Sequence, residues 1–90
     1  MNITQIPKKQ PDYYLEVMDG EILLFHLSRR NILYCNQTAS IIWQLCDGKR
    51  TVQDIITVLS NTYPESTDSI IEQTKSLLEQ FQKQGAIQFV

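Results

Sequence analysis

Residues 36–55, NQTASIIWQLCDGKRTVQDI, contain two helix starts and one helix stop. The side-chain oxygen of Asn36 can accept a hydrogen bond from a backbone N–H group in the first turn of a helix. Gly48 takes the left-handed backbone conformation without a steric penalty, so it predicts the end of that helix. Thr51 and Asp54 have the spacing of a capping box at the start of a second helix. The segment therefore predicts two helices joined by a tight turn.

Apolar residues at helical spacing support both helices and predict a third. Pro64 stops the second helix. The third opens between Ser66 and Ser69 and ends at Gly85, which again suits a left-handed cap. The expected buried stripes are Ala39, Ile42, Leu45 and Cys46 in the first helix, Val52, Ile55, Ile56, Leu59 and Tyr63 in the second, and Ile70, Ile71, Thr74, Leu77, Leu78 and Phe81 in the third.

The N-terminal half of the chain has the pattern of strands. Residues 13–18 alternate in the way that a half-buried strand requires, and Asp19-Gly20 is a strong signal for a tight hairpin turn. Residues 21–27 then predict a second strand, residues 28–31 a second turn, and Ile32–Cys35 a short third strand. Sequential strands joined by tight turns indicate an antiparallel meander.

Together these elements predict one α+β domain over residues 12–90, with a three-stranded antiparallel sheet followed by three helices. The helices have a winged helix-turn-helix-like arrangement. Residues 1–11 carry Pro7, Pro11 and a lysine pair without an apolar period, so we expect a flexible N-terminal tail. Residues 86–90 are expected to form one last extended segment that packs back on the domain.

Composition narrows the function classes. The 90 residues include 42 % hydrophobic residues, which suits a folded domain, and the net charge is −2. This charge argues against nucleic-acid binding, which usually requires a basic excess. The sequence has no apolar run long enough to cross a membrane and no apolar centre of a signal peptide, so we expect a cytoplasmic protein without membrane association. Cys35 and Cys46 are expected to be reduced there.

The sequence has no recognisable catalytic motif. His26 is the only histidine and lies among apolar residues, so a structural role is favoured over that of a general base. His26, Cys35 and Cys46 lack the spacing of a structural zinc site, and we expect no metal and no cofactor. Trp43 could be a binding hot spot, but packing against the sheet is favoured. The sequence therefore does not predict an enzyme.

The segment quoted above resembles the PqqD-like family. That family has a recurrent Leu-Asn-x-Thr-Ala-x-x-Ile-Trp-x-Leu-x-Asp-Gly-x-x-(Thr/Ser)-(Val/Ile)-x-x-Ile pattern, and the similarity extends over roughly residues 12–88. Two departures are Cys35 in place of a leucine and Gln73 in place of a common aspartate. The matching residues are Asn36, Thr38, Ala39, Ile42, Trp43, Leu45, Asp47, Gly48, Thr51, Val52 and Ile55.

The resemblance implies a non-enzymatic module that binds the leader segment of a ribosomally made precursor peptide. In such proteins the leader adds as a strand beside the third strand, against the third helix. The module then delivers the peptide to a modifying enzyme, either a radical-SAM maturase or a lasso-type leader peptidase with a cyclase. On this basis we expect a monomer whose leader site is formed by Ile32, Leu33, Tyr34, Cys35, Ile71, Thr74, Lys75, Leu78 and Gln82.

Two other functions remain as alternatives. A winged-helix transcriptional regulator would need a basic recognition helix, and the second predicted helix, residues 51–63, contains no lysine or arginine. An enzyme with Cys35 as its nucleophile would need a base and a reason for a low thiol pKa. The precursor peptide, the partner enzyme and the flank of the third helix that lines the site are left open.

Overall fold

The structure, a computed structural model, describes residues 2–28 and 32–90. Three strands form an antiparallel sheet in the order β2-β3-β4, where β2 spans Tyr13–Met18, β3 spans Glu21–His26 and β4 spans Ile32–Cys35. Asp19 and Gly20 join β2 to β3 with φ angles of 52° and 79°. Two consecutive residues with positive φ are typical of a type I′ turn, whose twist suits a hairpin. The predicted hairpin and meander are thus confirmed, although residues 29–31 of the second predicted turn lie outside the described residues.

Each predicted helix is present, and the caps at Asn36, Thr51 and Gly85 are as expected. α1 spans Gln37–Gln44, and its Ala39 N–H donates to the Asn36 side chain at 2.7 Å. It ends with Leu45 as its C-cap, three residues before the predicted stop at Gly48. α2 spans Val52–Thr62 and begins with the Thr51–Asp54 capping box. A short 3-10 turn, η1 (Pro64–Ser66), leads into α3 (Thr67–Gln84), which begins after Ser66 without a side-chain cap and ends at Gly85 with φ 81°. The fold is the α+β class that the sequence predicts, and winged helix-turn-helix is a loose description of it.

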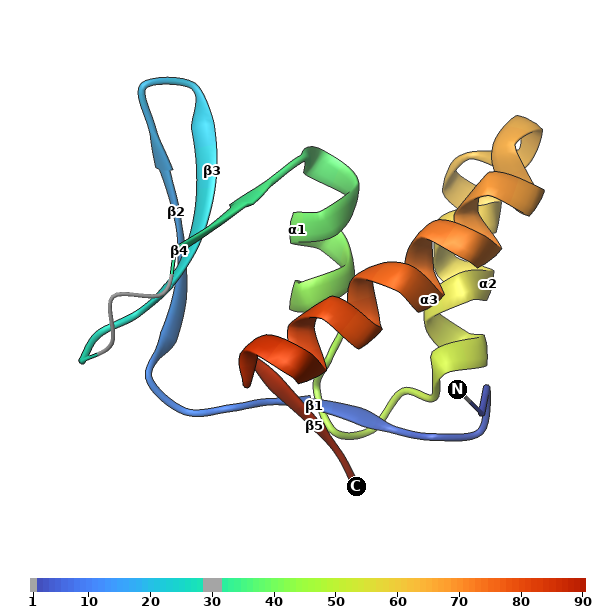
Figure 1. The fold of residues 1–90 in the computed structure, drawn as a ribbon. Helices are drawn as coiled ribbons and strands as arrows, with labels where there is room; N and C mark the ends of the chain where they lie inside the picture. The colour runs from blue at the N-terminus through green and yellow to red at the C-terminus, as the bar shows by residue number, and fades with distance from the viewer. Residues whose placement is uncertain (1, 29–31) are drawn as a thin grey trace.

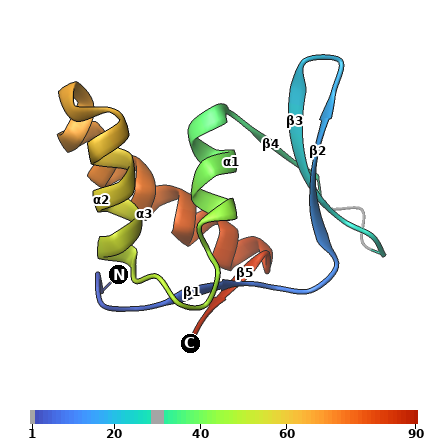
Figure 2. The ribbon, with the colours of Figure 1, turned by 180° about the vertical axis from the view of Figure 1, so that it is seen from behind.

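The hydrophobic core lies mainly among the helices. In both views α1 stands between the sheet and the other two helices (Figures 1 and 2). It packs against β3 and β4 on one side and against α3 on the other. The sheet therefore has helices on one face only. The fully or almost fully buried side chains include Leu24, Ile42, Trp43, Val52, Ile55, Leu59, Ile70, Leu78, Phe81 and Ile87.

The N-terminal segment differs from the flexible tail predicted for residues 1–11. Pro7–Lys9 form strand β1, which pairs antiparallel with β5 (Ile87–Phe89), the extended segment expected at the C-terminus. The Lys9 ammonium donates to the carbonyl of Gln44 at 2.9 Å and lies 5.3 Å from the centre of the Trp43 ring. The two strands cross below the helices in Figures 1 and 2. The domain contacts therefore begin before residue 12.

Candidate functional site

β4 is an edge strand with an unpaired outer side. Among residues 2–28 and 32–90, no strand pairs with β4 except β3. The backbone groups on that outer side follow from the alternation of an antiparallel ladder. The Leu27 N–H donates to the Asp12 carbonyl at 3.0 Å, so Asp12 and Leu27 form a hydrogen-bonded pair and every second pair toward the hairpin does the same. Residues 22 and 24 of β3 therefore direct their backbone groups to β4.

This alternation shows which residues of β4 have backbone groups that do not pair with β3. Residues 22 and 24 are paired with Cys35 and Leu33, so the backbone groups of those two residues are used inside the sheet. Ile32 and Tyr34 direct their N–H and C=O groups outward, away from β3. We call this row of groups the outer edge of β4. An exposed edge of this kind is a template for another strand.

The β4 side chains alternate between the two faces of the sheet. Leu33 and Cys35 are half-buried on the face toward the helices, where both pack against the core. Ile32 and Tyr34 lie on the opposite face and are 54 % and 73 % exposed. The structure therefore places all four predicted β4 residues on one accessible strand, two on each face.

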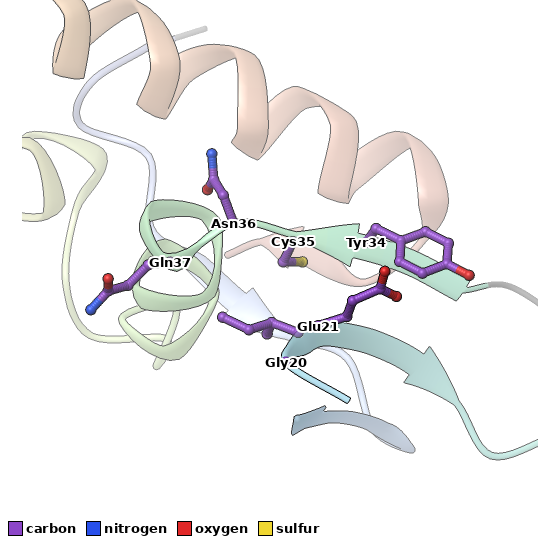
Figure 3. Close-up of a pocket in the computed structure, with 7 residues that line it drawn as sticks. Gly20, Glu21, Tyr34, Cys35, Asn36 and Gln37 are labelled. Atoms are coloured by element: carbon purple, nitrogen blue, oxygen red, sulfur yellow. The ribbon is translucent and has the colours of Figure 1, made fainter. Parts of the chain in front are cut away.

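The predicted α3 residues divide into two groups. Ile71 and Lys75 are half-buried and Gln82 is exposed, so these three side chains are accessible from one flank of the helix. Thr74 and Leu78 are 0 % exposed and belong to the core. They support α3 from beneath and are not available at its surface. In the view of Figure 3, β4 lies between α3 and β3.

A pocket of about 430 Å³ lies at the end of β4 next to the start of α1. Figure 3 shows the Glu21 side chain extending from β3 toward β4, next to Tyr34. The sequence did not point to this pocket, because residues from the β2–β3 turn and from the start of α1 meet there only in the folded chain. Its lining residues are Gly20, Glu21, Ile22, Tyr34, Cys35, Asn36 and Gln37.

The described residues hold no reactive thiol and no metal cluster. Burial raises the pKa of the Cys35 thiol and raises the pKa of Cys46 to about 12. Both thiols are therefore protonated at neutral pH, and a protonated thiol is a poor nucleophile. No group of three His, Cys, Asp or Glu side chains in residues 2–28 and 32–90 is placed to hold a metal ion.

The two aromatic side chains that the sequence left open have structural positions. His26 accepts a hydrogen bond at Nδ1 from the Ser28 backbone N–H at 3.0 Å and meets Tyr13 edge-on, with ring centroids 4.9 Å apart. Trp43 is buried in the core under Lys9. Its position agrees with packing rather than with a surface hot spot.

Within the described parts of the chain, none of the helices combines the length and the apolar character that a bilayer crossing requires.

Comparison with protein families adds to this geometry. The chain matches the model of coenzyme PQQ synthesis protein D (PqqD) over residues 21–87, which is well over half of its length. It belongs to the PqqD family. The matched region includes β3, β4 and all three α-helices, and so contains the outer edge of β4. No curated protein and no solved structure gave a significant match.

PqqD-family proteins are peptide-binding partners in the biosynthesis of cofactors and of ribosomally made peptides. They are accessory proteins without catalytic activity of their own. Their partners are a precursor peptide and a modifying enzyme. An accessible strand edge fits this general role.

Proposed function

We propose that this PqqD-family chain captures the leader segment of a ribosomally made precursor peptide as an additional strand beside β4. The observation that carries the proposal is the outer edge of β4, where Ile32 and Tyr34 offer unpaired backbone groups. Strand addition uses such an edge for affinity and uses alternate side chains for selectivity.

Backbone pairing alone is too weak for this role. Ile32 and Tyr34 offer two N–H donors and two C=O acceptors. At about 0.5–1.5 kcal/mol for each net hydrogen bond, they supply roughly 2–6 kcal/mol. A Kd of 1 μM corresponds to about 8 kcal/mol, and ordering the leader costs more. Burial of one or two apolar leader side chains, at about 1.5–3 kcal/mol each, supplies the difference.

We place these leader side chains between β4 and the accessible flank of α3. Leu33 and Cys35 form the strand side of this groove, and Ile71, Lys75 and Gln82 form the helix side. Lys75 would pair with an acidic leader residue. Thr74 and Leu78 are not part of the contact surface in this proposal, because their side chains are buried.

The bound precursor is then delivered to a modifying enzyme, either a radical-SAM maturase or a leader peptidase that acts with a cyclase. This chain contributes binding and presentation, while the enzyme performs the chemistry. Neither cysteine is activated and none of the described residues forms a metal cluster. We propose that the chain acts as a cytoplasmic monomer in this exchange.

The direct test is a titration of a fluorescently labelled leader peptide, from the precursor gene that neighbours the gene of this chain. We expect saturable binding by fluorescence anisotropy with a Kd on the order of micromolar or tighter. A scrambled leader of the same composition is the control. If the folded protein, checked by circular dichroism, shows no saturable binding, the proposal fails.

The same titration decides which flank of α3 faces the leader. Ile71 and Leu77 are both half-buried aliphatic residues of α3 that lie on different flanks of the helix. Truncation of Ile71 to alanine should weaken leader binding about tenfold, because it removes apolar contact area, whereas Leu77→Ala should leave the Kd within twofold of the parent. The reverse pattern would move the groove to the Leu77 flank.

Binding to duplex DNA tests the alternative function, a winged-helix regulator. α2, which would be the recognition helix of a winged-helix regulator, contains no lysine or arginine and has Asp54 in its first turn. Binding to phosphates depends on such cations. Tight, sequence-dependent DNA binding at physiological salt would support the regulator instead of the leader-binding module.

A further inference from the structure

The sheet face opposite the helices carries several exposed apolar side chains. The strand register places side chains of all three strands in neighbouring rows on this face. Tyr14, Phe25 and Ile32 form one row, and Leu23 and Tyr34 belong to the next. We call this surface, with Met18 at its hairpin end, the outer face: Tyr14, Met18, Leu23, Phe25, Ile32 and Tyr34.

Several of these side chains are open to solvent. Tyr14 is 47 % exposed and Met18 is 53 % exposed, in addition to Ile32 and Tyr34 on the edge strand. The rings of Tyr14 and Phe25 are 6.3 Å apart and tilted by 36°. With strands about 4.8 Å apart and about 3.4 Å of rise per residue, the three strands cover about 260 Å². The largest apolar patch on a monomer typically covers a few hundred Å² and is often functional.

Acidic side chains lie beside these apolar side chains toward the β2–β3 hairpin. Residues 12–28 contain four acidic residues and no lysine or arginine. Two of the acids lie on the same side of the sheet as the outer face and adjoin it, because Glu16 lies opposite Leu23 and Glu21 lies opposite Met18 in the register. A partner surface that is complementary to this face would have apolar side chains and a basic group where it meets the hairpin end.

We propose that the outer face is the docking surface for the modifying enzyme, and that the enzyme contacts the bound leader there as well. This inference rests on the proposed function, since it needs a leader strand beside β4. An added strand would direct every second side chain onto the outer face, next to Ile32 and Tyr34. The enzyme would then bind a composite surface of the chain and its cargo.

The size of the surface predicts coupling between the two ligands. About 260 Å² is well below the roughly 800 Å² per partner of a stable interface. A fourth strand enlarges the face by about one third and adds the leader's own side chains. The enzyme should therefore bind the loaded chain several times more tightly than the empty chain. By thermodynamic linkage, the enzyme should raise leader affinity by the same factor.

The test compares a double variant, Tyr14→Ser with Met18→Ser, with a matched control, Val58→Ser with Tyr63→Ser. Val58 and Tyr63 are exposed apolar residues that lie far from the sheet, on α2 and at its end. The probe is the purified modifying enzyme whose gene neighbours that of this chain, and its Kd is measured with and without saturating leader. Circular dichroism and thermal melting verify that each variant is folded.

We expect the sheet variant to lose at least tenfold in enzyme affinity, while its leader Kd stays within twofold of the parent. The control variant should match the parent in both measurements. An unchanged enzyme Kd for the sheet variant would overturn the docking surface. An enzyme Kd that is the same with and without leader would overturn the composite surface. A parent that fails to bind leader would instead contradict the proposed function, so the two failures are distinguishable.

Charge reversal supplies a second variant with little risk to the fold. The double variant Glu16→Lys, Glu21→Lys should weaken enzyme binding more at low salt than at high salt, because salt screens the attraction between exposed charges. Sedimentation velocity of the chain alone tests the other occupant, a second copy. A dimer in the parent that the Tyr14→Ser, Met18→Ser variant abolishes would assign the face to self-association and overturn the proposal.

Discussion

Deletion of residues 1–10 should destabilise the domain by about 3 kcal/mol or more, and so lower its Tm by roughly 12–24 °C. Six backbone hydrogen bonds of 2.9–3.0 Å join these residues to the loop after α1, to the start of α2 and to the C-terminal strand. At about 0.5–1.5 kcal/mol each they contribute roughly 3–9 kcal/mol, which is partly offset by the ordering of the segment. A domain of this size has only about 5–14 kcal/mol in total.

The beginning of α2 shows why this segment matters. The N–H groups of Val52 and Gln53 have no partner within the helix, and they donate to the carbonyls of Gln5 and Ile3. Deletion of residues 1 and 2 alone is the control, because the hydrogen bonds of Asn2 are local. Thermal melting decides the question. If the chain without residues 1–10 has the same Tm as the control, β1 does not contribute the stability that its hydrogen bonds indicate.

The second large effect concerns the outer edge of β4. Tyr34→Pro removes an outward N–H, and we expect leader binding to fall by about 1–2 kcal/mol or more, which is roughly 5–30-fold. Tyr34→Ala removes the ring but keeps the N–H, so the difference between the two variants isolates the backbone group. Leu33→Pro removes an N–H that is used inside the sheet, and should lower Tm. Anisotropy titrations and thermal melts are measured for each variant.

β2 offers a matched control, because it is the other edge of the sheet. By the same alternation, the N–H of Val17 points away from β3. Val17→Pro should therefore leave leader binding unchanged. The peptide does not dock on β4 if a folded Tyr34→Pro variant binds leader as tightly as the Tyr34→Ala variant does. A loss of leader binding in Val17→Pro would lead to the same conclusion.

The sequence predicted the elements that depend on local chemistry. The caps at Asn36, Thr51 and Gly85 and the turn at Asp19-Gly20 use side chains or backbone freedom within a few residues of the structure they form. β1 was missed because it is three residues long with one buried side chain, Pro7, and therefore has no period. Its partners lie about 40 and 80 residues away in the chain.

The candidate site was predictable in part for the same reason. The short apolar run after the second turn predicted the strand Ile32–Cys35, which the structure contains. The apolar stripe of α3 is wider than one face, so periodicity alone did not separate the buried Thr74 and Leu78 from the accessible Ile71 and Lys75. The outer edge of β4 needed the register of the whole sheet, which no local pattern contains.

Amide hydrogen exchange, measured by NMR with and without saturating leader, tests strand addition beside β4 most directly. In the free protein the N–H groups of Ile32 and Tyr34 have no partner in the sheet, so they should exchange quickly. We predict that the leader slows exchange at both amides by tenfold or more, and leaves the outward amides of Leu15 and Val17 on β2 unchanged. Unchanged exchange at Ile32 and Tyr34 under saturating leader, or new protection confined to β2, would contradict the account.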